Sequence, residues 1–363
     1  MGGRPMLFAI AVMSVITGIG FGLSVGADNF GLDSGYFRHC ALLLAQGGTE
    51  SCPGFPYPPL ARLVAIPLTW LPPTAAMAAM SAIGLAILLT GVALETRGRA
   101  RIDRVLVLVA VLGFVPVVYE LLLGQTTLLI AAAVYPVVRR PDTVRNGIPL
   151  GIALALAPKP MLLPLLVWML VWRRRALVAA LMAAVMLTAL GIALLGFAQY
   201  LDWFSVITGA ARQATEGSFW LSSPNKGNHS LWPLTPLTFV VACVVVVVTL
   251  WAIRRDVSRG FVASLLAGLL LAPYSLPYAY SILLLGVRPA LSFAPRATRA
   301  LALTANLASG FLITLLTAWS IAGLAACLTF ERLGRLRVGK FRLAHGTGAV
   351  PEADRAVEIP RPS

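Results

Sequence analysis

Residues 147–172 read GIPLGIALALAPKPMLLPLLVWMLVW, and this stretch decides the fold class. Two apolar arms flank Lys159 and its neighbouring prolines, and arginines lie just outside the arms at 145 and 173–175. A helix rises about 1.5 Å per residue, so each arm covers only part of a hydrocarbon layer about 30 Å thick. Arginines at both ends favour the same side of a membrane. We therefore predict two short helices that enter the membrane and turn back, with Lys159 at the apex.

The rest of the chain has the same apolar character. Of the 363 residues, 58% are hydrophobic and only 12% are charged, whereas soluble domains are about half apolar and a quarter charged. The apolar residues occur in long runs rather than in alternation. We predict an all-α polytopic membrane protein with about 11–12 membrane-spanning or half-spanning helices.

The expected organisation is one membrane domain, residues 1–330, with external loops at 26–73 and 198–232. Residues 331–363 are predicted to form a basic, disordered tail. Residues 36–46 in the first loop are typical of a short amphipathic helix at the interface. Straight crossings are expected over 6–25, 74–95, 105–122, 126–138, 176–197 and 233–253. A second broken unit is expected over 261–287, with its apex at 273–278, and 300–329 is either one tilted span or a tight hairpin.

The net charge of +15 is concentrated in short turns between the apolar runs. Arginine-rich turns on one side of a polytopic protein follow the positive-inside rule, so these turns are predicted to be cytoplasmic. This arrangement argues against a nucleic-acid partner, and the basic tail is expected to contact anionic membrane lipids. The arginines concerned are Arg97, Arg99, Arg101, Arg104, Arg139, Arg140, Arg145, Arg173, Arg174, Arg175, Arg254, Arg255 and Arg259.

The four cysteines fall into two pairs. Cys40 and Cys52 share the first external loop, where an oxidising compartment permits a disulfide, and the sequence leaves the bonded and free states open. Cys243 and Cys327 lie in apolar runs and read as buried thiols. No metal-ligand spacing is present.

Asp33 lies in a polar island, GLDSGYFRHC (31–40), just after the first hydrophobic run. A carboxylate held near a reacting centre can act as a general base on an acceptor hydroxyl. The structural alternative is a solvated acid that caps a short helix. Asp28 is the competing candidate for the base on spacing alone.

Lys159 is the second candidate, because a cation inside the membrane is a functional hypothesis by default. Its ammonium suits a lipid phosphate as a point charge, and the alternative is a side chain that extends to the headgroups. Glu120, at the outer end of its helix, is predicted to pair with Lys159 or Arg62.

Four further positions have a binding interpretation and a structural one. Tyr57, among prolines, forms either a wall for a sugar or prenyl chain or a packed turn. His229 orients a hydroxyl or is an ordinary loop histidine. Tyr278 and Tyr280 bind a sugar or anchor their helix at the interface.

These landmarks, in this order, resemble glycosyltransferase family 87, the polyprenyl-phosphate-mannose-dependent α-(1→2) mannosyltransferases of actinobacterial envelopes. The family has an Asp after the first helix, a YPP element, a GQ turn, a Lys-Pro break, an Asn-Gln-Ser motif and a proline-serine apex. The matching stretches here are DSGYFRHCALLLAQGG (33–48), FPYPPLARL (55–63), LLLGQTTLLI (121–130), ALAPKPMLLPLL (155–166), NHS (228–230) and PYSLPYAY (273–280). The resemblance covers residues 20 to 290.

Two departures from the family pattern concern the acceptor. His229 stands where glutamine is usual, and the second apex lacks the usual histidine, with Tyr278 and Tyr280 nearby. Phe37 stands where a tyrosine is usual. The usual acceptor is therefore not assumed.

The resemblance implies a GT-C type fold and an inverting sugar transfer, most directly of mannose, from a polyprenyl phosphate to a glycolipid or lipoglycan. It maps the catalytic base onto Asp33. It also implies Lys159 and Arg62 at the donor phosphate, with substrate contacts from Tyr57, Gln125, Asn228, His229 and Tyr278. No cofactor is expected, and a divalent metal is not expected although Asp28, Asp33 and Glu50 are external acids. An active site on the outer face of the plasma membrane follows from the same reading.

Three alternatives stay open at this point. Decaprenyl-phosphate arabinose is the rival donor, which would make the chain an arabinofuranosyltransferase. A lipid-linked sugar flippase or transporter would also use an intramembrane lysine and broken helices, but it would show paired halves that are not visible. A non-catalytic partner protein would tolerate the loss of Asp33.

Overall fold

A computed structural model of the chain describes residues 3–25, 30–47, 52, 55–215, 230–232, 234–273, 275–310 and 315–329. Within these residues every regular element is a helix, and no strand occurs. This confirms the predicted all-α class. The predicted tail, 331–363, lies outside the described residues.

Four helices of the described chain are long and apolar enough to cross a membrane: α1 (Gly3–Val25), α4 (Pro73–Glu95), α10 (Arg174–Leu195) and α12 (Pro236–Arg255). Helix α10 exposes an aliphatic face that includes Met182, Val185 and Met186. A face of this kind is costly in water and suits lipid. The protein is therefore a multi-pass membrane protein.

A bent pair accounts for the run expected as one straight crossing at 105–122. Helices α5 (Arg101–Leu112) and α6 (Val115–Leu123) meet at 61°, so that expectation is wrong. Pro116 lies in the first turn of α6 and has no N–H to continue the α5 hydrogen-bond ladder. Gly113 lies at the bend, where a side chain would overlap the backbone at Ser14 on α1.

The stretch around Lys159 folds as two short arms, as predicted. Helix α8 (Val144–Leu156) ends before the break, and η3 (Pro160–Leu162) and α9 (Leu163–Trp172) follow it. Helix α8 packs closely on α10, because Gly147 and Gly151 face the backbone of Ala176 and Ala180. Small residues at this spacing let membrane helices approach. The contact holds the arm that ends at Lys159.

The core lies around α13 (Val257–Leu271), which is buried along nearly its whole length. Trp168 on α9 is fully buried and donates its indole N–H to the carbonyl of Val257 at 2.9 Å. The second broken unit follows as η4 (Pro277–Leu283) and α14 (Leu284–Phe293). The proline-rich apex therefore leads into a 3₁₀ helix.

The C-terminal helices resolve the choice left open over 300–329. Helices α15 (Pro295–Gly310) and α16 (Leu315–Thr329) are separate elements. Trp319 on α16 donates to the carbonyl of Leu301 on α15 at 2.8 Å, so two residues 18 positions apart in the sequence are in contact. A hairpin fits this contact, and one straight span does not.

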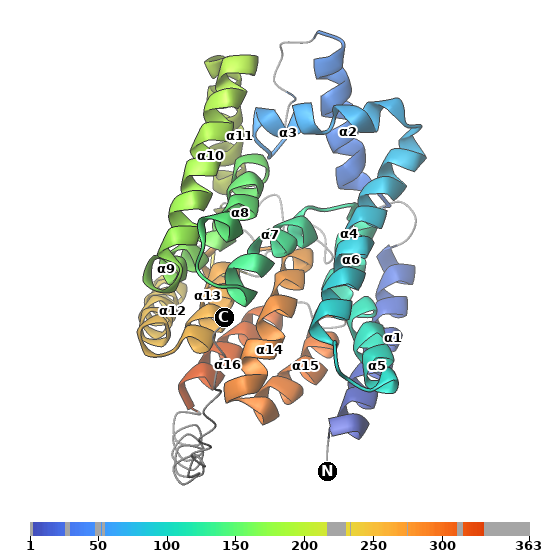
Figure 1. Ribbon diagram of the computed structural model, residues 1–363, viewed down its shortest axis with the longest axis vertical. Coiled ribbons are helices and arrows are strands. Elements are labelled where there is room, and N and C mark those ends of the chain that lie inside the picture. Colours follow the sequence, from blue (N-terminus) through green and yellow to red (C-terminus); the bar gives the residue numbers. More distant parts are fainter. Residues whose placement is uncertain are drawn as a thin grey trace, which may run out of the picture. The chain divides into compact units, whose positions relative to one another are not determined.

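The predicted external segments carry short helices at the top of Figure 1. They are α2 (Leu32–Ala45), α3 (Pro59–Val64), the 3₁₀ helix η2 (Ile66–Trp70) and α11 (Phe197–Thr215). The expectation that 198–232 is a loop is wrong for its first part, which is α11. Polar and apolar residues alternate in this first part with a helical period. Cys40 and Cys52 form a disulfide.

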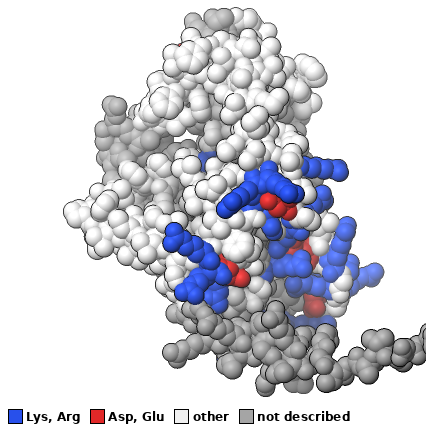
Figure 2. All heavy atoms as spheres, turned by 60° about the vertical axis from the view of Figure 1, so that its left-hand side comes forward, with Lys and Arg blue, Asp and Glu red and all other residues white. Residues whose placement is uncertain are grey.

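Arginines gather at the other end of the helices. Figure 2 shows Lys and Arg side chains in the lower half of one face, while its upper part is nearly free of charge. Ion pairs connect three helices in this region. Glu95 at the end of α4 binds Arg139 on α7 at 2.8 Å and Arg288 on α14 at 3.3 Å. Helix α2, which carries Cys40, lies toward the top of Figure 1, and the arginine-rich turn between α4 and α5 lies lower.

Candidate functional site

Asp33 lies in the first turn of α2 and is half-buried. The turn before it is fixed by Gly31, whose backbone is left-handed (φ 67°) and whose N–H bonds the carbonyl of Leu122 at 2.6 Å. Ser34 is fully buried against the same region. The start of α2 is therefore docked onto the end of α6, which aims the Asp33 carboxylate at the α6–α7 turn.

Gln125 lies in that turn, between α6 and α7 (Thr127–Arg139). Its side-chain amide donates a hydrogen bond to the Asp33 carboxylate. Its carbonyl oxygen accepts a bond of 2.9 Å from the Tyr57 hydroxyl. Gly124 allows the α6–α7 turn to approach α2 closely. Its φ is +69°, and a Cβ at this position would lie 2.8 Å from the Ser34 side chain. Tyr57, Gln125 and Asp33 thus form one hydrogen-bonded chain.

Tyr57 is held by aromatic packing before α3. Its ring lies 4.4 Å from the ring of Phe37 on α2 and 5.5 Å from Phe55. The Cys40–Cys52 disulfide belongs to the same small core. The structural interpretation of Tyr57 as a packed turn is therefore correct, and its hydroxyl still reaches Gln125.

Lys159, at the break after α8, points to the same place from another side. Its ammonium donates to the Thr127 hydroxyl at 2.8 Å and lies 4.9 Å from the centre of the Tyr278 ring. It also interacts electrostatically with the carboxylates of Asp33 and Glu120. The lysine and the aspartate, 126 residues apart in the sequence, lie in one electrostatic site.

Glu120 is buried at the end of α6 and caps the next helix. Its carboxylate accepts the backbone N–H of Leu128 at 2.9 Å. A carboxylate at a helix N-terminus satisfies free N–H groups and favours the helix dipole. Of the two partners expected for Glu120, the structure supports Lys159, whose ammonium interacts electrostatically with the Glu120 carboxylate. Thr127 was not singled out from the sequence, although it stands in the conspicuous GQTT turn.

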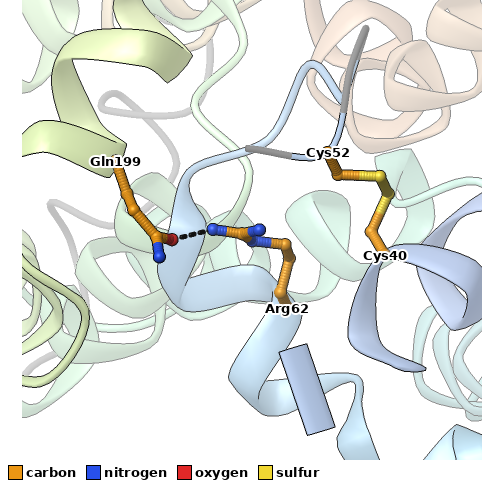
Figure 3. The surroundings of a disulfide bond; sticks show 4 residues. All are labelled: Cys40, Cys52, Arg62 and Gln199. Carbon is orange, nitrogen blue, oxygen red and sulfur yellow. Dashed lines mark hydrogen bonds between the residues drawn. A yellow bond between two sulfur atoms is a disulfide. The ribbon is translucent and has the colours of Figure 1, made fainter. Parts of the chain in front are cut away.

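Arg62 is buried on α3 and binds across to α11. Its guanidinium donates to the side-chain carbonyl of Gln199, and it lies beside Tyr200. Figure 3 shows Arg62 directed toward Gln199, close to the disulfide. These contacts give Arg62 a structural role at the α3–α11 junction, and its contact with a donor phosphate stays a prediction.

The remaining candidates have different outcomes. Tyr280 is 1% exposed and lies within the core, with its hydroxyl 3.4 Å from that of Ser320, and a sugar contact from Tyr280 stays a prediction. Tyr278 is buried beside Lys159. Asp28, Asn228 and His229 lie outside the described residues, and their roles stay predictions.

In the described part of the chain no group of three or more His, Cys, Asp or Glu residues could hold a metal ion.

The sequence profile of glycosyltransferase family 87 matches residues 55–277, which is more than half of the chain. The chain belongs to glycosyltransferase family 87. No curated protein and no solved structure matches it.

Family 87 membership makes the protein a membrane glycosyltransferase. The matched range includes Tyr57, Gln125 and Lys159, and Asp33 and Tyr278 lie outside it. The structure joins these two parts, because the residues on both sides of the boundary meet in the site described above. A sugar donor and a sugar acceptor are the substrates that this family requires.

Proposed function

We propose that this family 87 enzyme transfers mannose from a polyprenyl-phosphate donor to a glycolipid or lipoglycan acceptor on the outer face of the plasma membrane. The observation that carries the proposal is that Asp33 and Lys159 bind the same turn, Asp33 through Gln125 and Lys159 through Thr127. A carboxylate base and an ammonium near it are the two charges that transfer from a lipid phosphate requires.

The reaction is an inverting single displacement with Asp33 as the base. The acceptor hydroxyl oxygen attacks the anomeric carbon of the donor while Asp33 takes the hydroxyl proton. The bond between the anomeric carbon and the phosphate oxygen breaks, and its electron pair leaves with the polyprenyl phosphate. A β-linked donor then gives an α-linked product.

Gln125 and Tyr57 prepare the base for this step. The amide of Gln125 donates to one carboxylate oxygen of Asp33, which orients the carboxylate toward the acceptor hydroxyl.

Lys159 balances the charge that develops on the leaving phosphate. Its side chain is fixed by Thr127 and by the Tyr278 ring, so little reorganisation is needed when the donor binds. Arg62 is the second candidate for this phosphate, with Asn228 and His229 for the acceptor.

The active-site side and the lipid donor are supported by two features. The Cys40–Cys52 disulfide next to the Asp33 helix fits an oxidising compartment. The arginine-rich turns at the opposite end fit the cytoplasm. A donor supplied from the membrane agrees with a site built from membrane helices and their ends.

A donor comparison in membranes containing the enzyme tests the proposal. Radiolabelled polyprenyl-phosphate mannose should give a labelled lipid-linked product, and a nucleotide-activated mannose should give none once synthesis of the polyprenyl donor is blocked. Decaprenyl-phosphate arabinose is assayed in parallel. Incorporation from arabinose alone would replace mannose with the rival sugar, and incorporation from neither lipid donor, with a membrane extract as acceptor, would overturn the proposal.

A further inference from the structure

A second cavity, of about 980 Å³, lies among α1, α4, α5, α7 and α14–α16. Pockets for small molecules have volumes of roughly 300–1,000 Å³, so this one is large. None of Asp33, Tyr57, Gln125 or Lys159 lines it. The cavity is therefore separate from the transfer site, and the transferase proposal does not explain it.

The interior of the cavity is aliphatic. Aliphatic side chains from several of these helices meet there, including Ile10, Leu88, Val107, Ala131 and Leu291. This aliphatic part of the lining suits hydrocarbon chains in a membrane.

The polar part of the lining is strongly basic. It contains five arginines and two acids, which leaves a surplus of three positive charges. Ion pairs join both acids to arginines, with Arg4 on Asp103 at 3.1 Å and Arg139 and Arg288 on Glu95. Arg99 and Arg299 have no ion pair within the described residues. The complete charged set is Arg4, Glu95, Arg99, Asp103, Arg139, Arg288 and Arg299.

We propose that this cavity binds one anionic phospholipid from the leaflet that the arginine-rich end faces. Its acyl chains lie among the aliphatic side chains, and its phosphate lies against Arg99 and Arg299. Charge complementarity selects this occupant, because a zwitterionic headgroup would gain little from a surplus of positive charge. Basic pockets between membrane helices are a recurrent form of lipid headgroup site.

Trp319 lines the cavity and reports on its occupant. The full-length protein is reconstituted in phosphatidylcholine vesicles containing small fractions of brominated phosphatidylglycerol or brominated phosphatidylcholine. Bromine on the acyl chains quenches the fluorescence of nearby tryptophans. The contribution of Trp319 is the difference between the fluorescence of the wild type and that of Trp319→Phe. Half-quenching is expected at a lower fraction of the anionic lipid than of the zwitterionic one.

Two matched pairs of substitutions locate the headgroup. Arg99→Gln with Arg299→Gln should raise the half-quenching fraction of brominated phosphatidylglycerol about fivefold for each arginine. Arg97→Gln with Arg296→Gln removes the same charge from the same turn and the same helix, outside the cavity lining, and should have a much smaller effect. Asp33→Asn should bind the lipid as the wild type does, whatever its transfer activity.

Three results would overturn the lipid site. One is equal half-quenching by the two brominated lipids. Another is an equal loss in both pairs of variants, which would indicate diffuse surface charge. The third is relief of quenching by a neutral polyprenol, which would make an isoprenoid chain the occupant.

Discussion

The Lys159 ammonium donates a hydrogen bond of 2.8 Å to the hydroxyl of Thr127, the first residue of α7. Glu120 caps α7 at the next residue, where its carboxylate accepts the backbone N–H of Leu128 at 2.9 Å. The cation proposed for the donor phosphate is therefore held by the residue that starts the helix behind it. This link connects the broken helices to the turn that carries Gln125.

The Thr127 link predicts a specific loss of donor use. Thr127→Val keeps the size of the side chain and removes the hydroxyl that fixes Lys159. A hydrogen bond to a charged group contributes about 1.5–3 kcal/mol, so kcat/KM for the lipid donor should fall roughly 10- to 100-fold. Thr126→Val is the control, because the Thr126 hydroxyl lies 3.5 Å from the Tyr57 hydroxyl and does not touch Lys159. Equal losses in both variants would contradict the link.

The Gln125 bridge predicts non-additive effects. Gln125→Leu removes the bond to Asp33 and should lower kcat roughly 10- to 100-fold. Tyr57→Phe keeps the packing on Phe37 and should have a smaller effect, because Tyr57 acts through Gln125. The double variant should be no worse than Gln125→Leu alone. Losses that multiply would show that Tyr57 acts independently.

Gly124 predicts a stability effect with a defined partner. Gly124→Ala places a side chain at positive φ, which costs about 1–2 kcal/mol, and it pushes against Ser34 as well. A lower melting temperature in detergent is expected, and adding Ser34→Gly should recover part of the loss by removing the contact. Gly20→Ala is the control, since nothing lies within 4 Å of a Cβ there. No recovery in the double variant would contradict the proposed contact.

The disulfide predicts both stability and sidedness. Closing a loop of 12 residues stabilises a fold by about 3 kcal/mol in the chain-entropy account, so Cys40→Ser with Cys52→Ser should lower the melting temperature. Cys243→Ser should not. In intact cells, a membrane-impermeant maleimide should label Cys40 and Cys52 only after reduction. Labelling that requires permeabilised cells would place the Asp33 side in the cytoplasm.

The helices were largely predictable because each apolar run is long and bounded by prolines or arginines. The bend between α5 and α6 was not expected, although Pro116 signalled it, because the run reads as continuous in hydropathy. Helix α11 was not expected, because residues 198–232 were predicted to be an external loop. The disulfide was left open, since spacing alone does not bring Cys40 and Cys52 together.

The site was less accessible to sequence reasoning. Asp33 and Lys159 stood out locally, as an acid after a hydrophobic run and as a cation between two arms. Their contacts depend on tertiary packing, since Gln125 is 92 residues from Asp33 and Thr127 is 32 from Lys159. No periodicity encodes such distances. Thr127 reads as an ordinary helix start until Lys159 is placed beside it.

The most direct test of the account is sugar transfer by Asp33→Asn. A general base contributes roughly 10²- to 10⁴-fold, so transfer from the lipid donor should fall at least about 100-fold while membrane expression and melting temperature hold. Asp202→Asn, which changes an exposed acid on α11, should retain full transfer. Wild-type transfer rates in Asp33→Asn would contradict the assignment of the base, and Asp28→Asn would then be assayed in its place.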